Sequence, residues 1–271
     1  MRQRYLLEIV FLLIVITVSL IGFSSLVRGD RVALTGFHVL HIVVSLSWLL
    51  LLLVQLVLIR RRRFNRHRTI GTCIMVAGPI LIASVSLLTV HSAGRDAAAG
   101  AVDELVVQNV MFTLELALLV VLAFVLRRNR NVHGALLMST ALMFLVIAMF
   151  FTFISYVPGY RIEGPETFDR FARSGQTSAL IGSVIGLLFF LRNVRTGWPW
   201  ILVSGFLLMN GYLQMVVDQT GRTKALTVMV GSIGEVPAFG LAMTIFTGLL
   251  WMAWKWYRPG HDHLSPQLDA P

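Results

Sequence analysis

The sequence predicts an all-α protein that crosses a membrane eight times as a helical bundle. Of its 271 residues, 56% are hydrophobic and only 13% are charged, and the apolar residues fall into eight long runs. An average soluble domain is about 45–50% apolar and about 25% charged. A soluble core of this size cannot hide so much apolar surface. The composition therefore excludes a soluble enzyme, a disordered chain and a nucleic-acid-binding protein.

The eight runs predict helices that follow one another as antiparallel hairpins. A membrane-spanning helix needs about 20 predominantly apolar residues. Such runs occupy residues 5–27, 33–59, 69–91, 105–126, 134–157, 176–191, 198–217 and 236–257. The first run follows Arg2 and Arg4, as a secretory signal would. It is too long for a typical signal and lacks a clear cleavage site, so we expect a retained first helix.

The distribution of basic residues predicts the orientation of the bundle. If both termini are cytoplasmic, 15 of the 23 Lys and Arg residues lie in cytoplasmic segments, including six between residues 60 and 68. The positive-inside rule counts Lys and Arg in short loops and favours this orientation. The net charge of +10 is thus a topology signal and does not indicate nucleic-acid binding.

The spacing of the runs divides the chain into five parts. We expect a first helix with its outer turn (1–32), a histidine-bearing core of four helices (33–157), an outer loop rich in Pro, Gly and charge (158–175), a three-helix second part (176–257) and a disordered cytoplasmic tail (258–271). Cys73 is the one cysteine, which excludes an internal disulfide and a thiolate-ligated iron–sulfur cluster.

Small residues recur every four positions on two of the predicted helices. Membrane helices associate through such stripes because small side chains let backbones approach. We therefore expect close helix packing along both of them: Ser174, Ser178, Gly182 and Gly186, and Gly240, Thr244 and Gly248.

The second predicted helix carries a polar stripe that should face the bundle. Its members follow 3-4-3-4-3 spacing, which keeps them on one helical face: His38, His41, Ser45, Trp48, Leu52 and Gln55. His91 ends the third run at the same outer side. We expect one of the two stripe histidines to approach His91 and the other to turn toward the fourth or seventh helix.

Two further histidines lie at the expected inner side. His67 and His133 each follow a cluster of arginines at a turn between helices. Neutral imidazoles can ligate haem iron or a transition metal, so five histidines are candidate cofactor ligands: His38, His41, His91, His67 and His133. The alternatives are contacts with lipid head groups or helix caps for the inner two, and a proton relay for the outer ones.

Four polar residues lie within the apolar runs or directly after one, toward the outer side. Glu115 is about halfway along the fourth run, and Asn210, Gln214 and Asp218 are spaced i, i+4 and i+8 near the end of the seventh. An ionisable residue inside a bilayer is costly unless it is paired or reaches water. Glu115 is therefore either a neutral structural hydrogen-bonding group or part of a functional site.

Two short motifs resemble those of a family. The segment His67-Arg68-Thr69-Ile70-Gly71 is similar to the His-Arg-x-x-Gly element of uncharacterised bacterial multi-pass inner-membrane proteins. The segment from His133 to Met138 resembles their His-x-x-Leu-Met element, with Met one position later. The resemblance implies an inner-membrane location and no particular activity. More distantly, the chain resembles haem-copper oxidase assembly factors and haem A synthase, although its last three helices lack histidine.

These features leave three functions open. The first is a haem- or metal-binding protein linked to electron transfer or to assembly of a respiratory membrane complex. The second is a proton-coupled transporter in which Glu115, Asn210, Gln214 and Asp218 line a cavity. The third is a non-catalytic scaffold in the lipid bilayer. Motifs for hydrolysis and phosphoryl transfer are absent from the sequence, which makes these two enzyme classes poor candidates. Whether the protein is an enzyme of another class stays open.

Overall fold

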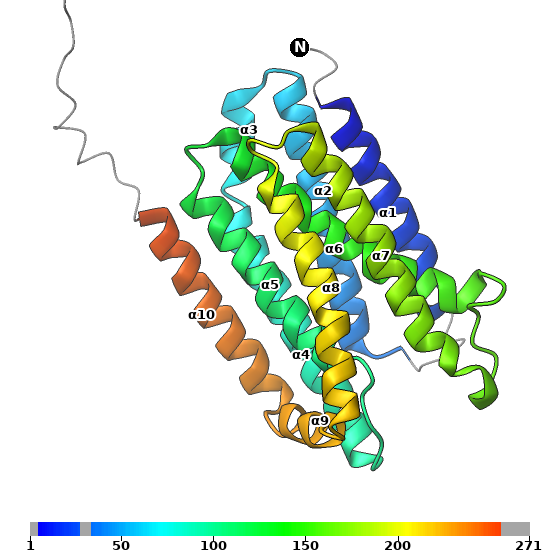
Figure 1. Ribbon diagram of the computed structural model, residues 1–271. Coiled ribbons are helices and arrows are strands. Elements are labelled where there is room, and N and C mark those ends of the chain that lie inside the picture. The colour runs from blue at the N-terminus through cyan, green and yellow to red at the C-terminus, as the bar shows by residue number, and fades with distance from the viewer. Residues whose placement is uncertain (1–4, 28–33, 256–271) are drawn as a thin grey trace, which may run out of the picture.

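The computed structural model describes residues 5–27 and 34–255, and within them the chain is a bundle of helices without strands (Figure 1). Eight helices are long and apolar enough to cross a membrane, as a multi-pass membrane protein requires. They are α1 (Leu6–Val27), α2 (Gly36–Arg60), α4 (Ile74–Ala98), α5 (Val106–Val125), α6 (Arg130–Tyr156), α7 (Asp169–Arg192), α8 (Trp198–Gln219) and α10 (Glu235–Lys255). The expected tail from residue 258 lies outside the described residues.

Three short elements join the long helices. The helix α3 (Phe64–Gly71) follows α2 at one end of the bundle, and α9 (Thr223–Gly231) follows α8 at the opposite end (Figure 1). A single 3-10 turn, Pro165–Thr167, precedes α7. We refer to the two ends of the bundle as the α3 end and the α9 end.

Two of the predicted boundaries are wrong by about two turns. The third span does not end at His91, because α4 continues to Ala98 and stops before Gly100, whose φ is +70°. Alanines favour the helix in that last stretch, and the charges of Arg95 and Asp96 pair with each other at 2.9 Å. α7 begins at Asp169, inside the expected outer loop, where Arg173 pairs with Asp169 across one turn at 3.1 Å.

α4 and α6 form the centre of the bundle. α6 packs against α1, α5, α7 and α8, while α4 packs against α2, α5, α9 and α10. Large side chains from these helices make one continuous core in which Trp48, Leu116, Leu136 and Phe246 are almost fully buried. α7, α8 and α10 lie at the periphery and expose many apolar side chains, as helices in contact with lipid do.

The small-residue stripe of α7 packs as expected, and that of α10 does not. All four residues of the α7 stripe are buried, and a Cβ on Gly182 or Gly186 would collide with Val146 or Ser204. On α10 the members of the second stripe are exposed. α10 instead turns its large side chains inward, so that Phe246 and Leu250 fill the space above Gly78 of α4. The expectation of packing within the chain along Gly240, Thr244 and Gly248 is therefore wrong.

Candidate functional site

A pair of histidines lies between α2 and α4 at the α9 end of the bundle. The ring centres of His38 and His91 are 6.0 Å apart, with the ring planes at 83°. The expectation that one stripe histidine approaches His91 is confirmed, and that residue is His38. The extension of α4 explains the match in depth, because it places His91 two turns inside the helix end.

The nitrogens of His91 have different surroundings. Its Nδ1 lies 2.8 Å from Oε1 of Glu235, the first residue of α10. A carboxylate oxygen accepts, so Nδ1 carries the donated proton. The Nε2 atom is buried and has no hydrogen-bond partner among the described residues. Since Nδ1 holds the proton in the neutral ring, Nε2 presents a bare lone pair.

His38 is fixed through Thr35, the residue that precedes α2. Oγ1 of Thr35 lies 2.7 Å from Nδ1 of His38, and the Thr35 backbone N–H points to the same nitrogen at 3.4 Å. These contacts close the first turn of α2 as a capping box. Both contacts are made by Nδ1, and the tautomer of His38 decides which atom is the donor in the 2.7 Å contact. The ring of Phe37 lies edge-on to His91, with centres 4.7 Å apart.

His41 lies one turn deeper and faces a different side from the one expected. Its Nδ1 is 3.4 Å from Oγ of Ser84 on α4, and its Nε2 is 3.4 Å from Oγ of Ser45. It therefore turns toward the helix of the third span, and the expected direction toward the fourth or seventh span is wrong. The physical reason is that α2 packs along α4.

The rest of the polar stripe of α2 is turned into the bundle, as expected. Ser45, Trp48, Leu52 and Gln55 are buried. Trp48 donates its indole N–H to Oγ1 of Thr140 on α6 over 3.0 Å. Toward the α3 end, the stripe finishes with Gln55.

Gln55 joins α2 to α3 through His67. With its amide group assigned so that every bond is satisfied, Gln55 donates to Nδ1 and the carbonyl oxygen of His67 and accepts from the Gly71 backbone N–H. Burial lowers the pKa of His67, and repulsion from His133 and Arg68 lowers it further. His67 is therefore a neutral ring at pH 7.

His133 lies near His67 but bonds separately. Its Nδ1 donates to the carbonyl oxygen of Ala123 on α5 over 2.7 Å. Its ring also lies edge-on to Phe124, with centres 6.2 Å apart. His133 thus ties the start of α6 to the end of α5.

The polar residues of α5 and α8 meet away from the histidines. Nδ2 of Asn210 donates to Oε2 of Glu115 over 2.9 Å, and Glu115 is only 3% exposed. Farther along α8, Gln214 donates to both carboxylate oxygens of Asp218, at 2.9 and 3.0 Å. Thr223 of α9 also donates to Asp218, over 2.6 Å.

Two acids in the loop before α5 complete this region, and the sequence analysis did not select them. Asp103 is 5% exposed, receives the Leu105 N–H on its carboxylate, and donates its own N–H to Thr227 of α9. Burial raises the pKa of Asp103. The pKa of Glu104 is raised by burial and by the negative charges of Asp218 and Asp103. An Asp three residues before a helix is a turn signal, and it pointed only to local structure.

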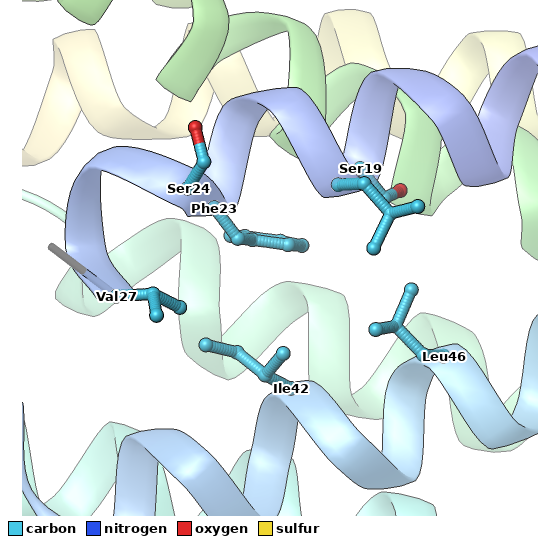
Figure 2. Close-up of a pocket in the computed structure, with 7 residues that line it drawn as sticks. Ser19, Phe23, Ser24, Val27, Ile42 and Leu46 are labelled. Atoms are coloured by element: carbon cyan, nitrogen blue, oxygen red, sulfur yellow. The ribbon is translucent and has the colours of Figure 1, made fainter.

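A cavity of about 280 Å³ lies elsewhere, between α1 and α2 (Figure 2). Its lining is almost wholly apolar: Ser19, Leu20, Phe23, Ser24, Val27, Ile42 and Leu46. None of the candidate site residues reaches it, so the histidine and carboxyl clusters are independent of this cavity.

Within residues 5–27 and 34–255, no group of three or more His, Cys, Asp or Glu side chains is arranged to hold a metal ion. No protein-family model, curated protein or solved structure matches this chain. The resemblance to inner-membrane proteins and to haem-handling families stays an expectation, and the function has to be argued from the geometry alone.

Proposed function

We propose that this chain is an inner-membrane protein with both termini in the cytoplasm and that it binds one haem between His38 and His91. In this orientation the α9 end faces outward, and the basic segment from Arg60 to Arg68, which contains α3, lies at the cytoplasmic surface. The excess of Lys and Arg on that side supports the orientation.

The observation that carries the haem proposal is the bare Nε2 of His91. A buried nitrogen lone pair without a partner is costly, and such orphans in native proteins often mark a group that binds something. A neutral imidazole nitrogen is a preferred axial ligand of haem iron. Two imidazoles on opposite sides of one metal have ring centres roughly 6 Å apart, because each metal–nitrogen bond is about 2 Å long. The separation of His38 and His91 agrees with this value.

The number of ligands favours haem over a bare metal ion. A structural metal held by side chains alone needs about four ligands. Groups of three or more suitable side chains are lacking in the described part of the chain. Haem supplies four nitrogens from its own ring, so two histidines are enough to complete its coordination.

Glu235 and Thr35 fit the role of supporting groups. Histidines that bind metals usually have their other ring nitrogen bonded to a carboxylate, a carbonyl or a water, which fixes the tautomer and makes the ligand more basic. Glu235 does this for His91. Thr35 fits this role for His38 in one tautomer. When Nδ1 donates to Oγ1 of Thr35 over 2.7 Å, Nε2 keeps a lone pair for the iron, and the longer 3.4 Å contact with the Thr35 N–H is then not a hydrogen bond.

The pair at the α3 end fits haem less well. Gln55 donates to Nδ1 of His67, so a neutral His67 carries its proton on Nε2 and has no lone pair there to offer. His67 and His133 are better explained as groups that join α2, α3, α5 and α6. We therefore propose one haem and not two.

Haem supplies one-electron redox chemistry when bound. The residues described here would position it: His38 and His91 as ligands, Glu235 as the acceptor that orients His91, and Phe37 as an apolar neighbour. A haem close to one membrane surface would suit exchange of electrons with a respiratory membrane complex, which we propose as the partner.

Absorption spectroscopy tests this proposal. The protein is expressed with sufficient haem, purified in detergent, and measured in its oxidised and reduced forms. We expect a Soret band, loss of that band in His38→Ala and His91→Ala, and its retention in His41→Gln. The His41 variant is the matched control, because it changes a neighbouring histidine on the same helix face while keeping side-chain atoms that can bond to Ser45 and Ser84.

Glu235→Gln provides a finer test. It replaces the carboxylate behind His91 by a neutral acceptor, so the haem should stay bound but become easier to reduce, because the ligand is less electron-rich. A wild-type protein without a Soret band refutes the haem proposal. Equal haem content in the His91 and His41 variants refutes the ligand assignment.

A further inference from the structure

Glu115 and Asn210 form a second buried polar cluster, apart from the histidine pair, and its chemistry does not depend on haem. Glu115 is the tenth residue of α5 and Asn210 lies past the middle of α8, so the two meet near the centre of the bundle. Two polar atoms of this pair are buried without partners: Oε1 of Glu115 and Oδ1 of Asn210. Both would be acceptors if Glu115 were ionised, and a buried acceptor without a donor is costly.

One proton would satisfy both atoms. A carboxylic acid and a carboxamide can form two hydrogen bonds in a ring, in which the amide N–H donates to one carboxyl oxygen and the acid O–H donates to the amide oxygen. The structure contains the first of these bonds, at 2.9 Å. The atoms of the second are the two that lack partners. We propose that Glu115 and Asn210 form a site that binds and releases a single proton.

Among the residues that the structure describes, no cation is bonded to Glu115 to hold it ionised. Asn210 is the one side chain hydrogen-bonded to it among the described residues. The charged or titratable groups of the helices packed on α5 lie toward the ends of those helices, except Tyr212, which is exposed. They are His91, Arg95 and Asp96 of α4, Arg130, His133 and Tyr156 of α6, Tyr212 and Asp218 of α8, Lys224 of α9, and Glu235 and Lys255 of α10. None of them bonds to Glu115 within residues 5–27 and 34–255.

The route for the proton runs along α8 to the α9 end. Asn210, Gln214 and Asp218 lie one turn apart on the same face, so the ladder covers about 12 Å from the buried acid to the surface. Gln214 is bonded to Asp218, and its own Oε1 is buried without a partner. Asp218 is exposed and lies near Glu104. In the other direction the interior is lined by apolar side chains, among them Leu119 of α5 and Leu207 of α8.

The chemistry of the step is simple. On release, the Glu115 O–H bond breaks, the proton passes to a water molecule and through water to the Asp218 carboxylate or the solvent, and Oδ1 of Asn210 loses its donor. On uptake the same steps run in reverse. The polar side chains that continue from the site along α8 lie toward the α9 end, which is the side from which the proton would enter and leave.

Infrared spectroscopy of the purified protein at neutral pH tests the proposal. A protonated carboxyl gives a C=O stretching band that is distinct from that of a carboxylate. We expect this band in the wild type and its loss in Glu115→Gln. In Asn210→Leu the band should move to higher frequency, because the acid loses both hydrogen bonds. Asp96→Asn is the control for an acid at the same end that is paired with Arg95 at the surface.

Exchange into heavy water tests the route. The band shifts when its proton is replaced by deuterium, and we expect this to be slower in Gln214→Leu than in Gln219→Leu, the same change at an exposed position on the same helix. A wild-type protein without the band, or an unmoved band in Asn210→Leu, overturns the site. Equal exchange in the two Gln variants overturns the route. If Glu115→Gln does not accumulate, the Asn210 variant and the wild-type deuterium shift decide the question.

Discussion

At Gly22, α1 lies directly against the backbone of α6. A Cβ placed there would lie 2.4 Å from the carbonyl oxygen of Ala148, a backbone atom that no side-chain rotation can move away. To reach the 3.4 Å of an ordinary contact, α1 would have to shift by about 1 Å. A gap of that size forfeits about a quarter to a half of the dispersion energy of the contacts that it opens.

Gly22→Ala should therefore destabilise the bundle by about 1–3 kcal/mol, the usual cost of overpacking. The shift would also stretch the hydrogen bond from Ser155 to Ser25, which is 2.9 Å long and lies one turn from Gly22. Unfolding by SDS in mixed micelles, followed by circular dichroism, measures the change in the free energy of unfolding.

Gly205→Ala is the matched control for this variant. Gly205 lies within α8, and a Cβ there would meet no atom within 4 Å. Alanine is the better helix former by about 0.5–1 kcal/mol, so this change should leave stability unaltered or raise it slightly. Equal stability of the two variants would refute the reasoning that backbone contact sets the packing of α1.

Three further changes probe other parts of the structure. The pKa of His67 is lowered on folding, so the unfolded chain binds more protons and stability should fall as the pH drops from about 7 toward 5. In SDS unfolding at a series of pH values, His67→Gln should lose less stability over this range than the wild type. An unchanged pH dependence in the variant would contradict this. Trp48→Phe removes the donor to Thr140 and should cost about 1–2 kcal/mol in the same assay, while a neutral effect would mean that the hydrogen bond contributes little. Reporter fusions after Arg130 and Lys255 should indicate the cytoplasm and one within residues 158–175 the exterior, and the reverse pattern would invert the proposed orientation.

The long helices could be predicted because lipid imposes a simple rule on sequence. Each span must be about 20 residues long and mainly apolar, and all eight were found on that basis. The end of α4 was misjudged because Arg95 and Asp96 suggest a loop, whereas they pair with each other on a helix covered by α9. The exposed stripe of α10 shows a similar limit. Spacing identified the small residues but not which face of the helix meets the bundle.

The contents of the two clusters were predictable, but their pairings were not. The sequence pointed to Glu115 and Asn210 separately, since each is polar within an apolar run. Their hydrogen bond joins residues 95 positions apart, and only the packing of α5 against α8 brings them together. The partner of His91 was likewise missed, although Glu235 is an acid at the first turn of a helix that begins on the same side.

The short helix α9 bonds to one cluster and packs on α4 one turn from the other. Gly231 lies against the backbone of α4 at Gly94, one turn beyond His91, with so little space that a Cβ on Gly231 would lie 2.7 Å from the Gly94 Cα. At its other end, Thr223 holds Asp218 and Thr227 receives the Asp103 N–H. A movement of α9 would therefore change the histidine pair and the outer end of the carboxyl ladder together. A ligand whose binding at His91 displaces α9 would alter the proton affinity of the Glu115–Asp218 ladder. Because coupling between two sites is reciprocal, protonation of the ladder would alter the affinity for that ligand by the same factor.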